Sequence, residues 1–100
     1  MIKPIYHYVF SDGVSFEDVE ASLLLAVMAA ECLHGAEQAR LDISHFLDHE
    51  RRCCVIDAAT RVGRDLNRFF VGFLRREFGD DAFQVRHAET GMTESTTTTL

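Results

Sequence analysis

The stretch RCCVIDA, residues 52–58, is an almost continuous run of small and β-branched apolar residues. A short run of this kind is typical of a strand in the middle of a sheet. Neighbouring side chains of a strand point to opposite faces, so Cys53 and Cys54 are expected on opposite sides of the sheet. That geometry argues against a shared metal ion, and a disulfide between adjacent strand residues would strain the backbone. We interpret the pair as strand residues, with Cys53, Val55 and Asp57 on one face and Cys54, Ile56 and Ala58 on the other.

The residues around this strand predict a hairpin before it and a helix after it. Residues 39–47, ARLDISHFL, alternate apolar and polar side chains, which is the pattern of a half-buried strand. The polar turn DHER, 48–51, joins the two strands. Thr60 is a candidate N-cap for a helix that is expected to end near Phe78, because Gly79 follows. A last strand is predicted over 81–88, DAFQVRHA.

The N-terminal part of the chain predicts one strand and one helix. PIYHYVF, residues 4–10, is rich in β-branched and aromatic residues and is followed by the turn-forming SDG. Ser15 is the expected N-cap of a helix that extends to about Leu33 and stops before Gly35. Either face of the first strand is a candidate for burial. One face carries Tyr6, Tyr8 and Phe10, and the other carries Ile5 and Val9.

The predicted order of elements is therefore β-α-β-β-α-β. Two split βαβ units with a hairpin between them describe a ferredoxin-like α+β fold. Right-handed crossovers give a four-stranded antiparallel sheet with the order 4-1-3-2 and both helices on one face. Residues 1–88 are expected to form this single domain, and the polar, Thr-rich residues 89–100 are expected to be a disordered tail.

Composition narrows the classes of function. The chain has 100 residues and a net charge of −6, which disfavours binding to nucleic acid because the phosphate backbone is also negative. The three cysteines form no C-x-x-C motif, and the N-terminus does not resemble a signal peptide. The longest apolar run, LLLAVMAA at 23–30, is far shorter than the ~20 residues that span a bilayer. A cytoplasmic protein that does not bind membranes is expected.

The first predicted helix is apolar nearly all the way round between residues 23 and 30. One stripe, containing Val19, Leu23 and Val27, is expected to face the sheet. Leu25, Met28 and Cys32 lie on the opposite side. Either this flank packs on the second helix, or it forms a contact with another subunit or partner.

The second predicted helix is amphipathic and basic. Five of the nine arginines lie between residues 59 and 79, whereas residues 11–37 contain six acids and no base, so the protein has two electrically opposite sides. The outer face of this helix is either simply solvated or a docking site for an acidic partner, because guanidinium groups pair bidentately with carboxylates. The arginines concerned are Arg61, Arg64, Arg68 and Arg75.

No established catalytic or cofactor motif is present in the sequence. The five histidines show no spacing that brings three or four metal ligands together, so neither a metal site nor a cofactor is expected. An enzyme would need to assemble its acid–base groups on the open face of the sheet. The candidates there are His7, Asp57 and Arg86.

The sequence thus favours a small, non-catalytic interaction or assembly module, expected to be a homodimer. Two surfaces compete for the dimer contact: the open face of the sheet around Val55, and the outer side of the first helix around Leu25, Met28 and Cys32. The alternative is a small enzyme whose site lies on the open sheet face or between two subunits.

Overall fold

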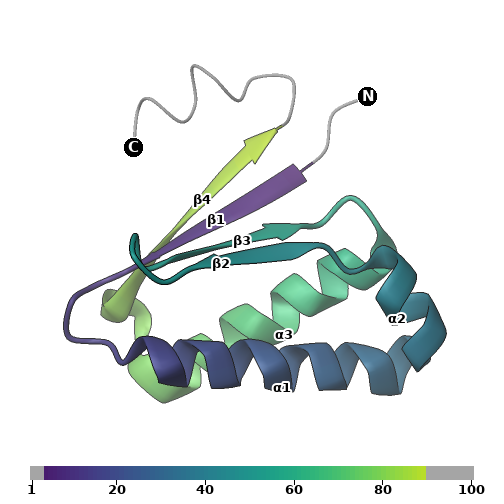
Figure 1. Ribbon diagram of the computed structural model, residues 1–100, viewed down its shortest axis with the longest axis horizontal. Coiled ribbons are helices and arrows are strands. Elements are labelled where there is room, and N and C mark those ends of the chain that lie inside the picture. Colours follow the sequence, from purple (N-terminus) through teal and green to yellow (C-terminus); the bar gives the residue numbers. More distant parts are fainter. Residues whose placement is uncertain (1–3, 90–100) are drawn as a thin grey trace.

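The computed structural model describes residues 4–89 of the chain. It is an α+β protein with a four-stranded antiparallel sheet and three α-helices (Figure 1). The predicted tail, 89–100, lies outside the described residues apart from Glu89. The elements are β1 (Pro4–Phe10), α1 (Phe16–His34), α2 (Ala36–Asp42), β2 (His45–Asp48), β3 (Cys53–Asp57), α3 (Arg61–Phe78), the short 3₁₀ helix η1 (Asp80–Ala82) and β4 (Phe83–Glu89).

The strands lie in the order β2-β3-β1-β4, which is the predicted order read from the other edge of the sheet. The stretch that contains the double cysteine forms the central strand β3, as expected. Its residue Val55 lies opposite His7 of β1 on one side and opposite Phe46 of β2 on the other. The edge strands are β2 and β4.

Helices α1 and α3 cover one face of this sheet, and among the described residues the other face is left open (Figure 1). The core between the layers contains Tyr8, which is fully buried and packs edge-on against Phe70 of α3, with ring centroids 4.9 Å apart. The hydroxyl of Tyr8 donates a hydrogen bond to the side-chain oxygen of Asn67. The face of β1 that carries Tyr6, Tyr8 and Phe10 is therefore the inner one.

The predicted starts and stops of the two long helices are confirmed. The Ser15 hydroxyl accepts a hydrogen bond from the Asp18 N–H at the start of α1, and the Thr60 hydroxyl accepts one from the Gly63 N–H at 2.9 Å at the start of α3. Gly35 and Gly79 follow the two helices with φ of 91° and 86°. Only glycine adopts such values without strain, which explains why both helices stop there.

The prediction of a strand over 39–47 was wrong, because residues 36–42 form the helix α2. Ala36, Glu37, Gln38 and Ala39 are strong helix formers, and Ala39 is buried against Ala30 and Val62. A hydrogen bond from Gln38 to Asp42 at 2.7 Å stabilises the turn. Leu41, which suggested a strand by its alternation with Ile43, is 80% exposed. The strand is thereby reduced to the four residues of β2.

Strand β3 begins one residue later than predicted, because Arg52 belongs to the turn. Its φ of 54° lies in the left-handed region. Its guanidinium donates to the backbone oxygens of Ser11 and Val14, and it lies 5.8 Å from the centre of the Phe16 ring. These contacts tie the β2–β3 turn to the loop that precedes α1 and offset the cost of the turn geometry.

Candidate interaction surfaces

The open face of the sheet is largely apolar along its two central strands. Alternation places Ile5, His7 and Val9 of β1 on this face, and Cys53, Val55 and Asp57 of β3 beside them. A solvated sheet face normally carries polar side chains at such positions. Phe46 of the edge strand β2 extends the apolar area and is 60% exposed. This face is therefore a candidate contact surface.

A shallow hollow of ≈ 470 Å³ lies on this face. His7 lines it and lies directly opposite Arg86 of β4 and Val55 of β3. Partial burial lowers the pKa of His7, and the charge of Arg86 lowers it further. The imidazole is therefore neutral at pH 7. The hollow is lined by His7, Val9, Phe46, Asp48, Arg51, Cys53, Val55, Gln84 and Arg86.

The three residues proposed as an acid–base set are only partly brought together. His7 and Arg86 are direct cross-strand neighbours, but Asp57 lies opposite Ile5 and outside the hollow. Its carboxylate accepts a hydrogen bond from the Ala59 N–H at 2.9 Å and so shapes the loop that leads into α3. His87 is on the other face of β4, where its ring lies 4.7 Å from that of Tyr6.

The double cysteine lies on two faces, as the alternation predicts. Cys54 is fully buried in the core, and burial raises the pKa of its thiol to about 12. Cys53 faces the open side but is almost covered by its neighbours, and burial again raises its pKa, with Asp48 adding to the effect. Both groups are neutral thiols at pH 7 and are poor nucleophiles.

The outer side of α1 carries large exposed apolar side chains. Leu25 and Met28, which the sequence singled out, are both more than half exposed, and Cys32 is also exposed. The flank is therefore not covered by α3, which packs on another side of α1. Two further exposed leucines of α1, Leu24 and Leu33, were not singled out from the sequence.

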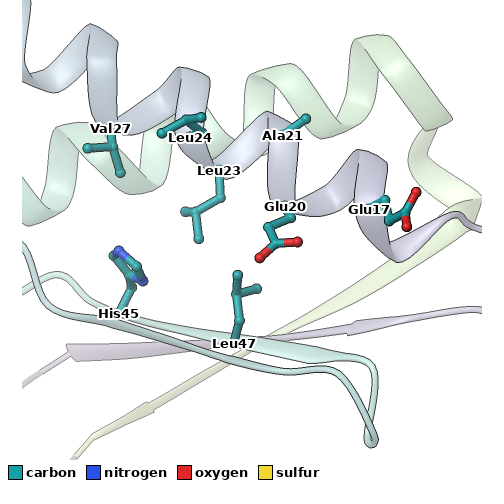
Figure 2. Close-up of a pocket in the computed structure, with 8 residues that line it drawn as sticks. All are labelled: Glu17, Glu20, Ala21, Leu23, Leu24, Val27, His45 and Leu47. Carbon is teal, nitrogen blue, oxygen red and sulfur yellow. The ribbon is translucent and has the colours of Figure 1, made fainter.

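A second hollow lies between α1 and the edge strand β2 (Figure 2) and has a volume of ≈ 460 Å³. In Figure 2, Leu23 and Val27 of α1 lie over Leu47 and His45 of β2, the carboxylate of Glu20 points from α1 toward Leu47, and Glu17 lies at one end. Desolvation by these walls lowers the pKa of His45. The lining residues are Glu17, Glu20, Ala21, Leu23, Leu24, Val27, His45 and Leu47, and we call this site the α1–β2 groove.

The arginines of α3 are exposed, as predicted for its outer face. Arg75 forms an ion pair with Asp80 at 3.2 Å. Within residues 4–89 no ion pair is found for Arg61, Arg64 or Arg68. Arg61 and Arg64 stand in the first turns of the helix, where the helix dipole is positive and cations are disfavoured. Within the described residues these three guanidinium groups are thus exposed and not engaged in an ion pair.

In the described part of the chain, no three His, Cys, Asp or Glu side chains converge as a metal ion requires. None of the helices between residues 4 and 89 is both long and apolar enough to cross a bilayer. Comparison with known proteins gives no match to a family model, to a curated protein or to a solved structure.

Proposed function

We propose that this protein is a small, non-catalytic cytosolic assembly module with a ferredoxin-like arrangement, and that it forms a homodimer through the open face of its sheet. The observation that carries the proposal is the apolar character of the outward positions of both central strands. Val9, Cys53 and Val55 belong to this face, and the exposed Phe46 lies at its edge. Covering such a patch removes apolar surface from water, which is the main driving force of association.

The charges on this face suit contact with a second copy. A two-fold symmetric interface brings the same patch of both subunits together, so the patch must complement itself. The hollow contains carboxylate and guanidinium groups together, namely Asp48 with Arg51 and Arg86. The outer side of α1 lies in a segment with six acids and no base, and pairing it with itself would bring like charges together. The sheet face is therefore favoured over Leu25, Met28 and Cys32.

The arrangement of the acid–base candidates supports a binding role over catalysis. A general base needs a defined proton to abstract and a group that orients it. His7 has a cationic neighbour in Arg86, while Asp57 is directed to the backbone of its own loop. The alternative, an enzyme whose cleft forms between two subunits, would use His7 and Arg86 at the interface itself.

The solution mass of the wild type and of Val55→Glu and Phe46→Glu variants tests this proposal. Val55→Glu places a negative charge in the centre of the proposed contact, and Phe46→Glu places one at its edge. In a dimer either carboxylate would be buried without a partner. The variants are expected to be folded monomers. An arginine-mediated contact of α3 with an acidic protein is a second proposed interaction, and it uses a different surface.

A further inference from the structure

We propose that the α1–β2 groove binds an extended segment of a partner protein, which adds to the sheet as a fifth strand beside β2 and carries alternating apolar residues together with lysine or arginine. This inference concerns a different surface from the proposed dimer contact and does not depend on it. Three observations support it: the open backbone edge of β2, the apolar walls of the groove and the acidic charge at its rim.

The pairing register of β2 with β3 shows which backbone groups of β2 point away from the sheet. The Asp57 N–H donates to the Ser44 carbonyl oxygen at 3.0 Å, so Ser44 directs its backbone groups toward β3. Backbone groups alternate along an antiparallel strand, which makes Phe46 face β3 as well and turns His45 and Leu47 outward. Because β2 pairs only with β3 among the described strands, these outward groups are free to pair with an added strand.

The same two residues also define the apolar floor of the groove. The side chains of His45 and Leu47 point to the helix side of the sheet, below Leu23 and Val27 of α1 (Figure 2). Alternate side chains of an added strand would enter this space, as they do when peptides extend the edge of a sheet next to a helix. The lowered pKa of His45 keeps its imidazole neutral at pH 7, so it adds no positive charge to the floor.

The rim determines the charge of the occupant. Glu17 and Glu20 stand on the α1 side of the groove. The carboxylate of Glu20 lies 3.7 Å from His49, which is the nearest basic group and is itself largely exposed. Residues 11–37 contain no lysine or arginine, and within residues 4–89 neither Glu17 nor Glu20 forms an ion pair with a lysine or arginine. A basic segment complements it, whereas a second copy docked edge to edge would bring two acidic α1 helices together.

The test uses a fluorescent hexapeptide, Val-Lys-Val-Lys-Val-Lys, titrated with the full chain and followed by anisotropy. Two further peptides carry N-methyl groups on all valine amides or on all lysine amides. Alternate residues of a strand direct their amides to the same edge, so one methylated set blocks pairing with β2 and the other leaves it intact. We expect one methylated peptide to bind like the parent and the other to lose binding. Equal binding of both would overturn strand addition.

Matched variants locate the site on the protein. Leu24→Lys in the groove and Glu20→Lys on its rim are each expected to weaken peptide binding by about ten-fold or more. The controls make the same changes elsewhere: Leu33→Lys, at a residue about as exposed as Leu24 on the same helix, and Glu37→Lys on α2. Loss of binding in the controls to the same degree would contradict the assignment. So would a wild-type dimer that is dissociated by Leu24→Lys, because that result would make a second copy the occupant.

Discussion

A Cβ atom on Gly63 would lie 2.4 Å from the backbone carbonyl oxygen of Asp57, which is too close for any side chain. The first turn of α3 therefore packs directly on the end of β3. The Thr60 cap and the Asp57 carboxylate hold the loop between them. This contact fixes how the start of α3 lies against the end of β3 on the inner face of the sheet.

The first prediction concerns this contact. Gly63→Ala is expected to lower the free energy of unfolding by about 1–3 kcal/mol, because the backbone of the loop must move to admit the methyl group. Gly72→Ala is the matched control in the same helix, where a Cβ meets nothing within 4 Å. It is expected to raise stability by about 0.5–1 kcal/mol, since alanine favours helix more than glycine. Urea denaturation measures both, and equal effects of the two variants would refute the close packing.

The second prediction concerns the thiols. One thiol per chain, that of Cys32, is expected to react rapidly with Ellman's reagent, because it is the exposed cysteine. Cys53 and Cys54 are buried and their pKa values are raised, so they are expected to react only after unfolding in urea. Cys32→Ser should remove the fast phase entirely. A fast-reacting thiol that remains in that variant would show that Cys53 or Cys54 is open to solvent.

The third prediction concerns acid stability. The folded-state pKa values of His7 and His45 are lowered, so the unfolded chain binds more protons once the pH falls below about 6.5. The stability that comes from burying these two imidazoles in their neutral form is fully present above that pH. It is lost as the pH falls toward their lowered folded-state pKa values. The urea midpoint should decline less between pH 7.5 and 5.5 in a His7→Gln, His45→Gln double variant than in the wild type. An unchanged decline would contradict the desolvation of these rings.

The fourth prediction concerns the arginine face of α3. Retention of the protein on immobilised poly-glutamate is expected to be abolished by Arg64→Glu with Arg68→Glu, because these groups have no ion-pair partner within residues 4–89. Arg75→Glu is expected to have a smaller effect, since Arg75 already pairs with Asp80. If the double variant eluted at the same salt concentration as the wild type, this would argue against an acidic partner at this face.

Much of the fold was predictable from local signals. The caps Ser15 and Thr60 and the stops Gly35 and Gly79 fixed both long helices, because each acts on backbone groups within its own turn. The helix α2 was missed because Leu41 and Ile43 have the two-residue spacing that is typical of a strand. The burial of Ala39, which favours the helix, depends on residues distant in the sequence. The inner face of β1 was undecided for the same reason: both faces are apolar, and Asn67 of α3 supplies the partner that allows Tyr8 to be buried.

The candidate surfaces were predictable to a smaller extent. Alternation along β3 placed Val55 on the open face, and helical spacing placed Leu25 and Met28 on the outer side of α1. Phe46 and the α1–β2 groove were missed although the predicted order placed this strand at the edge of the sheet, because the strand was expected over 39–47 and not over the four residues of β2. Edge position is set by strand pairing across the whole chain, and no local pattern reports the exposure that results from it.

The molecular mass in solution, measured by light scattering at several protein concentrations, tests the central claim most directly. The wild type is expected to have twice the 11.3 kDa mass of one chain, and Val55→Glu and Phe46→Glu are expected to have the mass of one chain while keeping the wild-type circular dichroism spectrum. Leu25→Glu, on the outer side of α1, is expected to remain a dimer. A monomeric wild type, or a dimer that Leu25→Glu dissociates and Val55→Glu does not, would contradict dimerisation through the open face of the sheet.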